Sequence, residues 1–463
     1  AFFIIIFDIY WLIKTIYLSI HLKVAYRKIM DNTKIDWINK LANLSDKQKT
    51  IKKNWPDLYH LIILPVYQEN YEMIKLALQA LVDDDYPKEK MIVVLAPEFR
   101  SGPTYLETAR QLENEFKNKF FQFLLVIHPA DLPNEIPGKG SNINFAGQTV
   151  QKKIIDPLQI NYDDIIVSAF DIDTRAEKGY FACLTYNFLT TKNPLKSSYQ
   201  PIPLYINNIW PAPSFSKIVA FSATFWHMIQ QERPERLTTF SSHSMPFRAL
   251  VEVGFWQKNV VSEDSRIFWQ FFLYYNGDWR VQPIYYPVKM DALIAPTVPK
   301  TLINLYKQQR RWGFGVENIP YFIFAFTKNK LIPLKKKLYF SLTIIEGFHS
   351  WATNALIIFL FGWLPLILGG TNFKTTLISY NLPIMTRNIM IFAMIGLISS
   401  AILTINLLPT KPEKHSKLIY IWMFFQWLLL PYTIIFLGSF PALESQTRLM
   451  FKKYLGFWVT PKD

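Results

Sequence analysis

The chain has 463 residues, 50% of them apolar and 16% aromatic, and 50 Lys and Arg against 35 Asp and Glu give a formal net charge of +15. An apolar fraction this high excludes intrinsic disorder, and 16 Gly and 29 Pro exclude a collagen-like or low-complexity sequence. The single cysteine, Cys183, excludes a disulfide framework and a Cys-rich zinc site. A mean hydropathy of +0.10 is high beside 18% charged residues, so we expect a charged soluble part and a strongly apolar part in one chain.

The first apolar segment begins the chain. Residues 2–20 are interrupted only by Asp8 and Lys14, and a helix of this length spans the roughly 30 Å of membrane hydrocarbon. A signal peptide is the alternative, but a basic start and a small-residue cleavage site are both missing. We predict a transmembrane helix over residues 1–20 and a basic linker over 21–56, whose positive charge indicates the cytosolic side.

Three further apolar runs lie near the end of the chain. They carry no charged residue and cover residues 351–369, 388–408 and 418–440. Runs of this length without charge are typical of membrane-spanning helices. We therefore predict about three transmembrane helices within 351–440, a tail over 441–463, and a multi-pass protein of the inner or plasma membrane with a cytosolic middle domain.

The charge of the tail disagrees with that number of spans. Three spans after a cytosolic domain leave the tail outside, although Arg448, Lys452 and Lys453 prefer the cytosolic side. Either a fourth span or re-entrant segment lies within residues 319–350, or the tail breaks the rule. A basic balance can also indicate nucleic-acid binding, but here the charge follows the apolar segments, so we predict no nucleic-acid partner.

The middle of the chain alternates between short strands and helices. The predicted strands cover 60–67, 91–95, 121–127 and 165–170, and the predicted helices cover 71–82, 103–119 and 141–152. The strands are continuous apolar runs, which is typical of a parallel sheet covered on both faces. The predicted fold class is therefore α/β with a Rossmann-like, mostly parallel sheet, and ligands of such sheets bind beyond the carboxyl ends of the strands.

Two carboxylates follow the fourth predicted strand. Asp171 and Asp173 are separated by one residue just past its end. Mg²⁺ is commonly held by one or two carboxylates together with substrate phosphates. We predict a divalent metal here that bridges to a diphosphate; a helix N-cap or a solvated turn is the alternative.

A glycine-rich loop follows the third predicted strand. Gly138, Lys139 and Gly140 can present backbone N–H groups and an ammonium to an anion. The spacing of a P-loop is absent, and a plain turn before a helix is the alternative.

Two later segments carry further candidates. Glu263 and Asp264 precede an aromatic helix predicted over 266–275, where a carboxylate can serve as a helix cap or as a general base for an acceptor hydroxyl. In a helix, Gln308, Arg311 and Trp312 share one face, where the Arg can neutralise a diphosphate and the Trp can stack on a sugar; an amphipathic interface helix is the alternative. The lone His243 is interpreted as structural.

Taken together and in this order, the motifs resemble membrane-integrated family 2 glycosyltransferases, the group that includes cellulose and hyaluronan synthases. The resemblance covers roughly residues 58–315. Its segments are Pro65–Asn70, similar to the nucleotide-contacting loop; Lys139–Asn144, similar to K-A-G-N-x-N; Asp171 and Asp173, matching D-x-D; Ser262–Asp264, matching T-E-D with Ser for Thr; and Gln308, Arg311 and Trp312, matching Q-x-x-R-W.

The resemblance implies a GT-A domain over 57–290, interface helices with the Q-x-x-R-W motif over 291–350, and an inverting transfer from a nucleotide-diphospho sugar. By that resemblance the residues would divide into donor-binding Pro65, Tyr67, Glu69, Glu98, Lys139, Asn142 and Asp171; metal-binding Asp171 and Asp173; catalytic Glu263 and Asp264, with Asp264 deprotonating the acceptor; and Gln308, Arg311 and Trp312 at the diphosphate and the acceptor end. The implied cofactor is Mg²⁺ or Mn²⁺. The implied partners are the donor, a growing polysaccharide or lipid-linked glycan, and the lipid bilayer.

One position departs from the family pattern. Many relatives have an Asp pair after the second strand, where this chain reads Ala96-Pro97-Glu98. At this position Glu98 would take the place of the Asp that contacts the base in the relatives. UDP is the default donor nucleotide. An inactive membrane scaffold, a glycoside hydrolase with paired carboxylates and a transporter are the alternatives; the complete acidic set and the large α/β segment argue against them.

Overall fold

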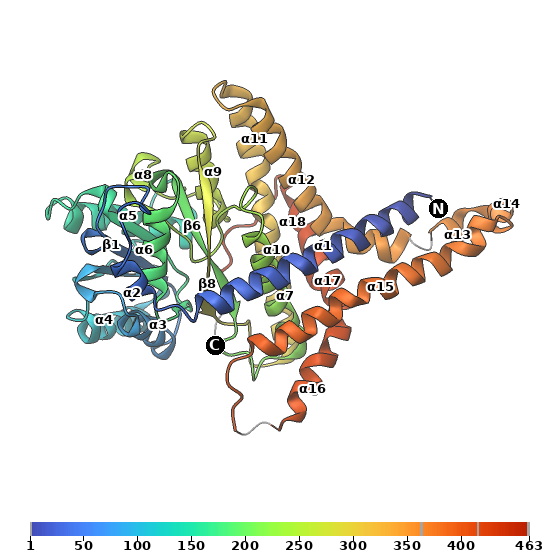
Figure 1. Ribbon diagram of the computed structural model, residues 1–463, viewed down its shortest axis with the longest axis horizontal. Helices are drawn as coiled ribbons and strands as arrows, with labels where there is room; N and C mark the ends of the chain where they lie inside the picture. Colours follow the sequence, from blue (N-terminus) through green and yellow to red (C-terminus); the bar gives the residue numbers. More distant parts are fainter. Residues whose placement is uncertain (1, 362–363, 414–415, 461–463) are drawn as a thin grey trace.

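The computed structural model describes residues 2–361, 364–413 and 416–460. The middle of the chain forms an α/β body, and the long helices α1 (Phe2–Asn32), α12 (Leu334–Leu356) and α15 (Leu377–Leu407) extend from it to one side (Figure 1). The charged and apolar parts expected from the composition are therefore separate in space.

The described residues form one eight-stranded sheet with the order β3-β2-β1-β4-β7-β6-β8-β5. The strands are β1 (Tyr59–Val66), β2 (Met91–Pro97), β3 (Gln122–Leu125), β4 (Ile165–Ala169), β5 (Arg175–Ala176), β6 (Ser197–Tyr205), β7 (Ser244–Pro246) and β8 (Arg280–Met290). The four predicted strands are β1 to β4, and they are mutually parallel, with β1 between β2 and β4. The parallel half of the prediction is confirmed.

The other half of the sheet is mixed. β7 is antiparallel to β4 and to β6, β5 is antiparallel to β8, and β6 and β8 are parallel. These strands were not predicted from the sequence, and the reasons are physical. β5 and β7 are only two and three residues long, while β6 is fully buried yet contains serine, glutamine and proline, so no apolar run marks it.

Helices cover both faces of the sheet (Figure 1). Those of the body are α2 (Trp37–Ala42), α3 (Tyr71–Asp83), α4 (Pro103–Phe116), α5 (Lys139–Val150), α6 (Tyr180–Thr190), α7 (Ser214–Gln231), α8 (Phe247–Glu252), α9 (Glu263–Tyr274), α10 (Val298–Gly313) and α11 (Asn318–Lys328). Alternation along β1 sends Ile62 and Leu64 to the face under α3, α4 and α6, and Leu61 and Ile63 to the face under α5 and α9. The predicted helices 71–82, 103–119 and 141–152 correspond to α3, α4 and α5.

The remaining helices form the apolar part. They are α13 (Leu364–Leu368), α14 (Gly370–Lys374), α16 (Leu418–Phe425), α17 (Leu430–Ile434) and α18 (Phe440–Met450), besides α1, α12 and α15. Among the described residues, two helical stretches are long and apolar enough to cross a membrane. One is Phe2–Asn32, and the other is Leu418–Met450, which runs from α16 to α18. These contain the predicted spans 2–20 and 418–440. The predicted span 388–408 overlaps α15, in which Gly396–Leu407 is a shorter apolar stretch. The predicted span 351–369 includes residues 362 and 363, which lie outside the described residues.

Burial within α3 generates a stability prediction. Leu78 is completely buried against the sheet, whereas Leu76, two residues earlier, is 43% exposed. Leu78→Ala should destabilise the protein by about 2–5 kcal/mol because it removes apolar contacts and leaves a cavity. Leu76→Ala, the matched control, should change stability by less than about 1 kcal/mol. Thermal or denaturant unfolding of the two purified variants checks this, and equal losses would contradict the packing described.

Candidate functional site

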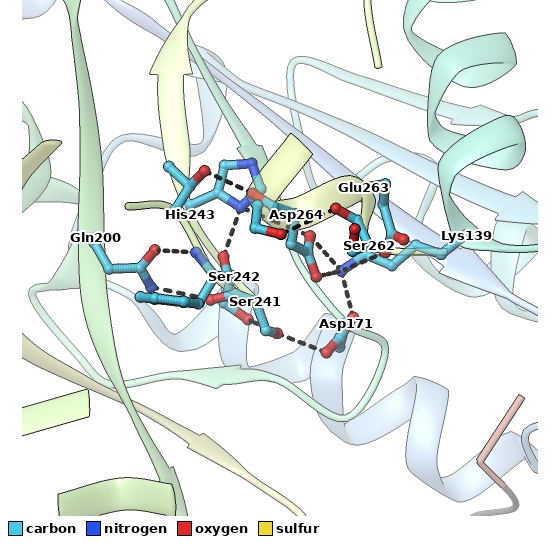
Figure 2. Close-up of polar contacts among 12 residues, drawn as sticks. Lys139, Asp171, Gln200, Ser241, Ser242, His243, Ser262, Glu263 and Asp264 are labelled. Atoms are coloured by element: carbon cyan, nitrogen blue, oxygen red, sulfur yellow. Dashed lines mark hydrogen bonds and ion pairs between the residues drawn. The ribbon is translucent and has the colours of Figure 1, made fainter. Parts of the chain in front are cut away.

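A buried ammonium joins three loops at the carboxyl ends of the parallel strands. Lys139 Nζ lies 2.6 Å from Asp171 Oδ1, 2.9 Å from Asp264 Oδ1 and 3.9 Å from Glu263 Oε1 (Figure 2). The Lys139 side chain is 9% exposed and that of Glu263 is 2% exposed, whereas Asp171 and Asp264 are 27% and 22% exposed. Residues predicted separately from three motifs therefore form one cluster, here called the lysine–carboxylate cluster (Lys139, Asp171, Glu263 and Asp264).

The two glycines beside Lys139 allow neighbouring segments to approach. Gly138 has a φ of +155°, and a Cβ atom added there would lie 2.5 Å from Phe457 Cγ. A Cβ atom at Gly140 would lie 3.0 Å from Glu263 Cβ and 3.1 Å from the backbone oxygen of Gln257. Glycine at both positions thus admits the C-terminal segment on one side and the Glu263 segment on the other.

Asp171 is held by a segment that precedes β7. Ser241 Oγ donates a hydrogen bond of 2.6 Å to Asp171 Oδ2. Gln200 on β6 fixes that segment, because its Oε1 accepts from the backbone N–H of Phe240 and its Nε2 donates to the backbone oxygen of Ser241 (Figure 2). Asp171 is therefore oriented by two groups, the Lys139 ammonium and the Ser241 hydroxyl.

Asp264 lies in the first turn of α9, where the helix dipole favours a negative charge. Thr239 Oγ1 donates to the Asp264 backbone oxygen at 2.6 Å. His243 is fully buried, donates from Nδ1 to the backbone oxygen of Phe240 at 2.7 Å, and places the same nitrogen 3.7 Å from Asp264 Oδ1. Burial lowers the pKa of His243, so this histidine is neutral at pH 7. The interpretation of His243 as structural must be extended, because its ring borders the site.

Charge and burial compete inside the cluster. Burial alone would lower the pKa of Lys139, but the attraction of the Asp171 and Asp264 carboxylates outweighs it and raises that pKa, so the ammonium is permanent. Burial, together with the charge of Asp264, raises the pKa of Glu263 to about 8. The buried Glu263 therefore retains its proton at neutral pH.

Asp173 lies just beyond this cluster. Its Oδ2 accepts from the backbone N–H of Asp291 at 3.1 Å, and Asn207 Nδ2 donates both to the Asp173 backbone oxygen at 3.1 Å and to Asp291 Oδ1 at 2.8 Å. Asp173 is 2% exposed. The ends of β4 and β8 are thus joined at this carboxylate.

A narrow pocket lies beside Asp291, whose backbone N–H donates to Asp173. It is lined by Tyr205, Asp291, Gln308 and Trp312 together with apolar side chains of α7. The charges of Asp171, Asp173 and Asp264 add to burial in raising the pKa of Tyr205, and the charge of Arg311 opposes them, so the phenol stays protonated. Two of the three predicted Q-x-x-R-W residues therefore line a pocket next to the acidic residues.

The predicted nucleotide-contacting residues form a second group. Glu69 Oε2 accepts from the backbone N–H of Tyr67 at 2.7 Å, and the Arg100 guanidinium lies 4.2 Å from the centre of the Tyr67 ring. Arg100 also forms an ion pair with Glu98, which is only 5% exposed. Arg100 thus already neutralises Glu98, and it was not among the predicted site residues.

Asn142 and Pro65 hold the loops around this group. The Asn142 side-chain amide donates to the backbone oxygen of Ala96 at 2.7 Å and is almost completely buried. Pro65 lies near the end of β1, opposite Ala96 of β2 in the parallel register. In the structure, Asn142 ties α5 to the end of β2.

The C-terminal segment, residues 451–460, returns to the site. The Arg311 guanidinium lies 5.0 Å from the Phe457 ring centre, and the Lys307 ammonium lies 5.5 Å from the Trp458 ring. Phe457 also contacts Gly138, as described above. Residues 441–463 are predicted as a tail, and the sequence signal for contacts there is the pair of adjacent aromatic residues, Phe457 and Trp458.

The carboxylate oxygens of Asp171, in the cluster, and of Asp173, beside it, suit a divalent cation. Asp171 and Asp173 supply carboxylate oxygens, which Mg²⁺ and Mn²⁺ prefer, and a diphosphate would supply further oxygens. The described residues contain no group of three or more His, Cys, Asp or Glu arranged to hold a metal. A metal here would therefore depend on substrate oxygens in addition to the two carboxylates.

A family model describes more than half of the chain. The model for glycosyl transferase family group 2 matches residues 166–440, which include Asp171, Asp173, Asp264 and the Q-x-x-R-W residues. The chain belongs to this family. The protein is accordingly a glycosyltransferase, as the motifs predicted. A comparison with curated protein sequences found no match.

Two solved structures are similar to this glycosyltransferase at low identity. A mannosyltransferase from Pyrobaculum calidifontis, in complex with GDP-Man and Mn²⁺, is 12% identical with a TM-score of 0.47, and 95% of this chain and 99% of that chain are covered. S. aureus TarS in complex with UDP-GlcNAc is 13% identical with a TM-score of 0.40, and 86% and 93% are covered. TM-scores below 0.5 are too low for these structures to bear on the fold or the function of this glycosyltransferase.

The raised pKa of Glu263 predicts a pH dependence of stability. Its ordinary value is 4.5, so between pH 4.5 and about 8 the folded state retains a proton that the unfolded state releases. The contribution of Glu263 to the free energy of unfolding therefore falls as pH rises through this window. Glu263→Gln should remove that contribution and so change the slope of stability against pH, whereas Glu107→Gln, an exposed control on α4, should not. Unfolding measured from pH 5 to pH 8 checks this, and parallel curves for the parent and Glu263→Gln would refute it.

Proposed function

We propose that this glycosyltransferase transfers a sugar, with inversion, from a nucleotide-diphospho sugar to a growing polysaccharide or lipid-linked glycan at a membrane. UDP is the default nucleotide, and the α/β body is proposed to be a cytosolic GT-A domain of the cellulose and hyaluronan synthase type. The observation that carries the proposal is the lysine–carboxylate cluster, with Lys139 Nζ 2.6 Å from Asp171 and 2.9 Å from Asp264. It combines anion-binding and acid–base groups at the edge of the sheet where ligands bind.

The donor diphosphate would lie between Lys139 and Arg311. Lys139 is the first residue of α5, so the free N–H groups of that helix end add to the attraction of its ammonium for phosphate oxygens. Asp171 and Asp173 would hold Mg²⁺ or Mn²⁺, which supplies Lewis-acid stabilisation of the departing diphosphate. Tyr67, Glu69 and Glu98, with Pro65 and Asn142 shaping their loops, would contact the nucleoside.

Asp264 would act as the base, with Glu263 beside it. In this proposal the acceptor hydroxyl gives its proton to the Asp264 carboxylate while its oxygen forms a bond to the anomeric carbon. The bond between that carbon and the diphosphate oxygen breaks on the opposite face, and its electron pair leaves with the diphosphate. One displacement of this kind inverts the anomeric configuration.

The acceptor would enter past Gln308 and Trp312. Both line the pocket beside the acidic residues, and an aromatic face suits the apolar face of a sugar ring. The Q-x-x-R-W motif favours repeated addition of sugars.

Membrane integration is supported by apolar side chains exposed along the helices. These include Phe2, Phe3, Ile6 and Ile13 on α1, Leu377, Ile391 and Phe392 on α15, and Leu418, Trp422 and Phe425 on α16. Apolar surface of this extent is characteristic of contact with lipid. The proposed localisation is the inner or plasma membrane, with the α/β body on the cytosolic side.

The assignment of the base is tested by Asp264→Asn. Removal of a general base lowers the rate by about 10²- to 10⁴-fold, while UDP binding should persist because the amide keeps the size of the side chain. Asp278→Asn is the matched control, since this exposed aspartate pairs with Lys196 on the surface. Transfer from radiolabelled UDP-glucose, UDP-N-acetylglucosamine and GDP-mannose is measured in membranes that contain each variant. Transfer at the parent rate by Asp264→Asn would refute the assignment.

Metal dependence is tested by chelation. EDTA should abolish transfer, and added Mn²⁺ or Mg²⁺ should restore it, because the diphosphate would otherwise leave without charge compensation. Asp173→Asn should require at least about tenfold more metal for the same rate, because it weakens one of the two proposed protein ligands. Full activity in EDTA would contradict the proposed metal.

A further inference from the structure

Glu317 is a buried carboxylate that no motif includes. Its Oε1 accepts hydrogen bonds from the backbone N–H groups of Val261 and Ser262, each at 3.0 Å, and from Ser262 Oγ at 2.8 Å. The residue is 7% exposed and lies in the short helix η7 (Phe314–Glu317) that follows α10. One carboxylate oxygen thus holds the backbone that leads directly into Glu263 and Asp264.

These contacts fix the start of α9. The N-terminal N–H groups of a helix have no partner within the helix and need an external acceptor. Ser262 occupies the N-cap position but makes no side-chain cap, because its hydroxyl donates to Glu317 instead. The Glu317 carboxylate therefore places a negative charge at this helix end, where the dipole favours it. Asp264 is the second residue of α9, so its carboxylate moves with this end.

Asn318 and Arg266 complete the arrangement. Asn318 Nδ2 donates to Ser262 Oγ at 3.2 Å and to Ser265 Oγ at 3.0 Å, while Arg266 Nη2 donates to the Glu317 backbone oxygen at 3.3 Å. Asn318 and Arg266 are 2% and 4% exposed. The first turn of α9 is therefore tied to residues 317 and 318 by buried polar contacts, which are costly to break singly.

The second oxygen of Glu317 is bound by the C-terminal segment. Tyr454 OH donates to Glu317 Oε2 at 2.7 Å, and the Tyr454 ring packs edge-on against Phe314 with 5.1 Å between ring centres. Three residues later, Phe457 contacts Gly138 beside Lys139. The C-terminal segment is thus connected to Asp264 through Glu317, and to the glycine-rich loop at Gly138, Lys139 and Gly140 through Phe457.

We propose that Glu317 is a positioning residue for the base Asp264, and that Tyr454 holds Glu317 in the orientation that this requires. The inference rests on the proposed function, in which Asp264 receives the acceptor proton. By this inference Glu317 affects the chemical step and not the binding of the donor, because Glu317 contacts the start of α9 and not the glycine-rich loop that contains Lys139.

The test compares kcat, donor KM and the Kd for UDP in Glu317→Ala, Glu317→Gln and Tyr454→Phe. A displacement of about 1 Å at a catalytic group lowers the rate about 100-fold, which is the expected loss of kcat in Glu317→Ala. Glu317→Gln retains an acceptor oxygen and should lose roughly tenfold, and Tyr454→Phe, which removes one hydrogen bond, should lose about threefold to tenfold. Donor KM and the Kd for UDP should stay within about twofold, as expected for an interaction that acts only in the transition state.

The chain offers a matched control pair. Tyr275 OH donates to Glu252 at the surface, so Tyr275→Phe and Glu252→Ala remove the same kind of hydrogen bond away from the site. Both should retain the parent kcat. Parent kcat in Glu317→Gln and Tyr454→Phe would overturn the proposal, and so would a loss of UDP binding that equals the loss of kcat. These two variants also decide the matter if Glu317→Ala does not fold.

Asp264→Asn separates the two proposals. An Asp264→Asn protein that transfers sugar at the parent rate overturns the proposed base, and with it the role of Glu317. An inactive Asp264→Asn protein together with fully active Glu317→Gln and Tyr454→Phe proteins overturns only the inference about Glu317.

Discussion

The structure of the site depends on one buried ammonium. Lys139 pairs with Asp171 at the end of β4 and with Asp264 at the start of α9, and without it these two carboxylates would repel each other at the sheet edge. The glycines on both sides of Lys139 permit this closeness, since any side chain at residue 140 would press on Glu263. In the proposed function, the Lys139 ammonium that pairs with these carboxylates also binds the donor diphosphate.

Much of the first half of the sheet and the central cluster could be predicted from the sequence. Uninterrupted apolar runs predicted β1 to β4, and because ligand-binding loops follow the carboxyl ends of such strands, the sequence also placed Lys139 and Asp171 at one edge of the sheet. β5 and β7 could not be predicted, because two or three residues show no periodicity. Ser241 and Gln200 were missed because their role comes from long-range contacts and neither belongs to a motif.

The contacts of the C-terminal segment were equally invisible in the sequence. Tyr454 and Phe457 lie more than 130 residues from Glu317 and more than 300 from Gly138, and only the folded chain brings them together. The ion pair between Arg100 and Glu98 was also not predicted, and it changes how the Glu98 carboxylate can bind a nucleobase. The apolar helices, in contrast, were predicted by composition and length, and two of them meet the requirements of a membrane span.

The central claim is that the lysine–carboxylate cluster, with Asp173, holds a metal and a nucleoside diphosphate together. Electron paramagnetic resonance of Mn²⁺ in the presence and absence of UDP or GDP tests it most directly, because bound and free Mn²⁺ give different signals. Binding of Mn²⁺ should strengthen when the nucleoside diphosphate is added, since two carboxylates alone leave the coordination incomplete. The gain should disappear in Asp173→Asn and persist in Asp278→Asn. Binding of Mn²⁺ that ignores both nucleotides, or that is unchanged in Asp173→Asn, would contradict the account.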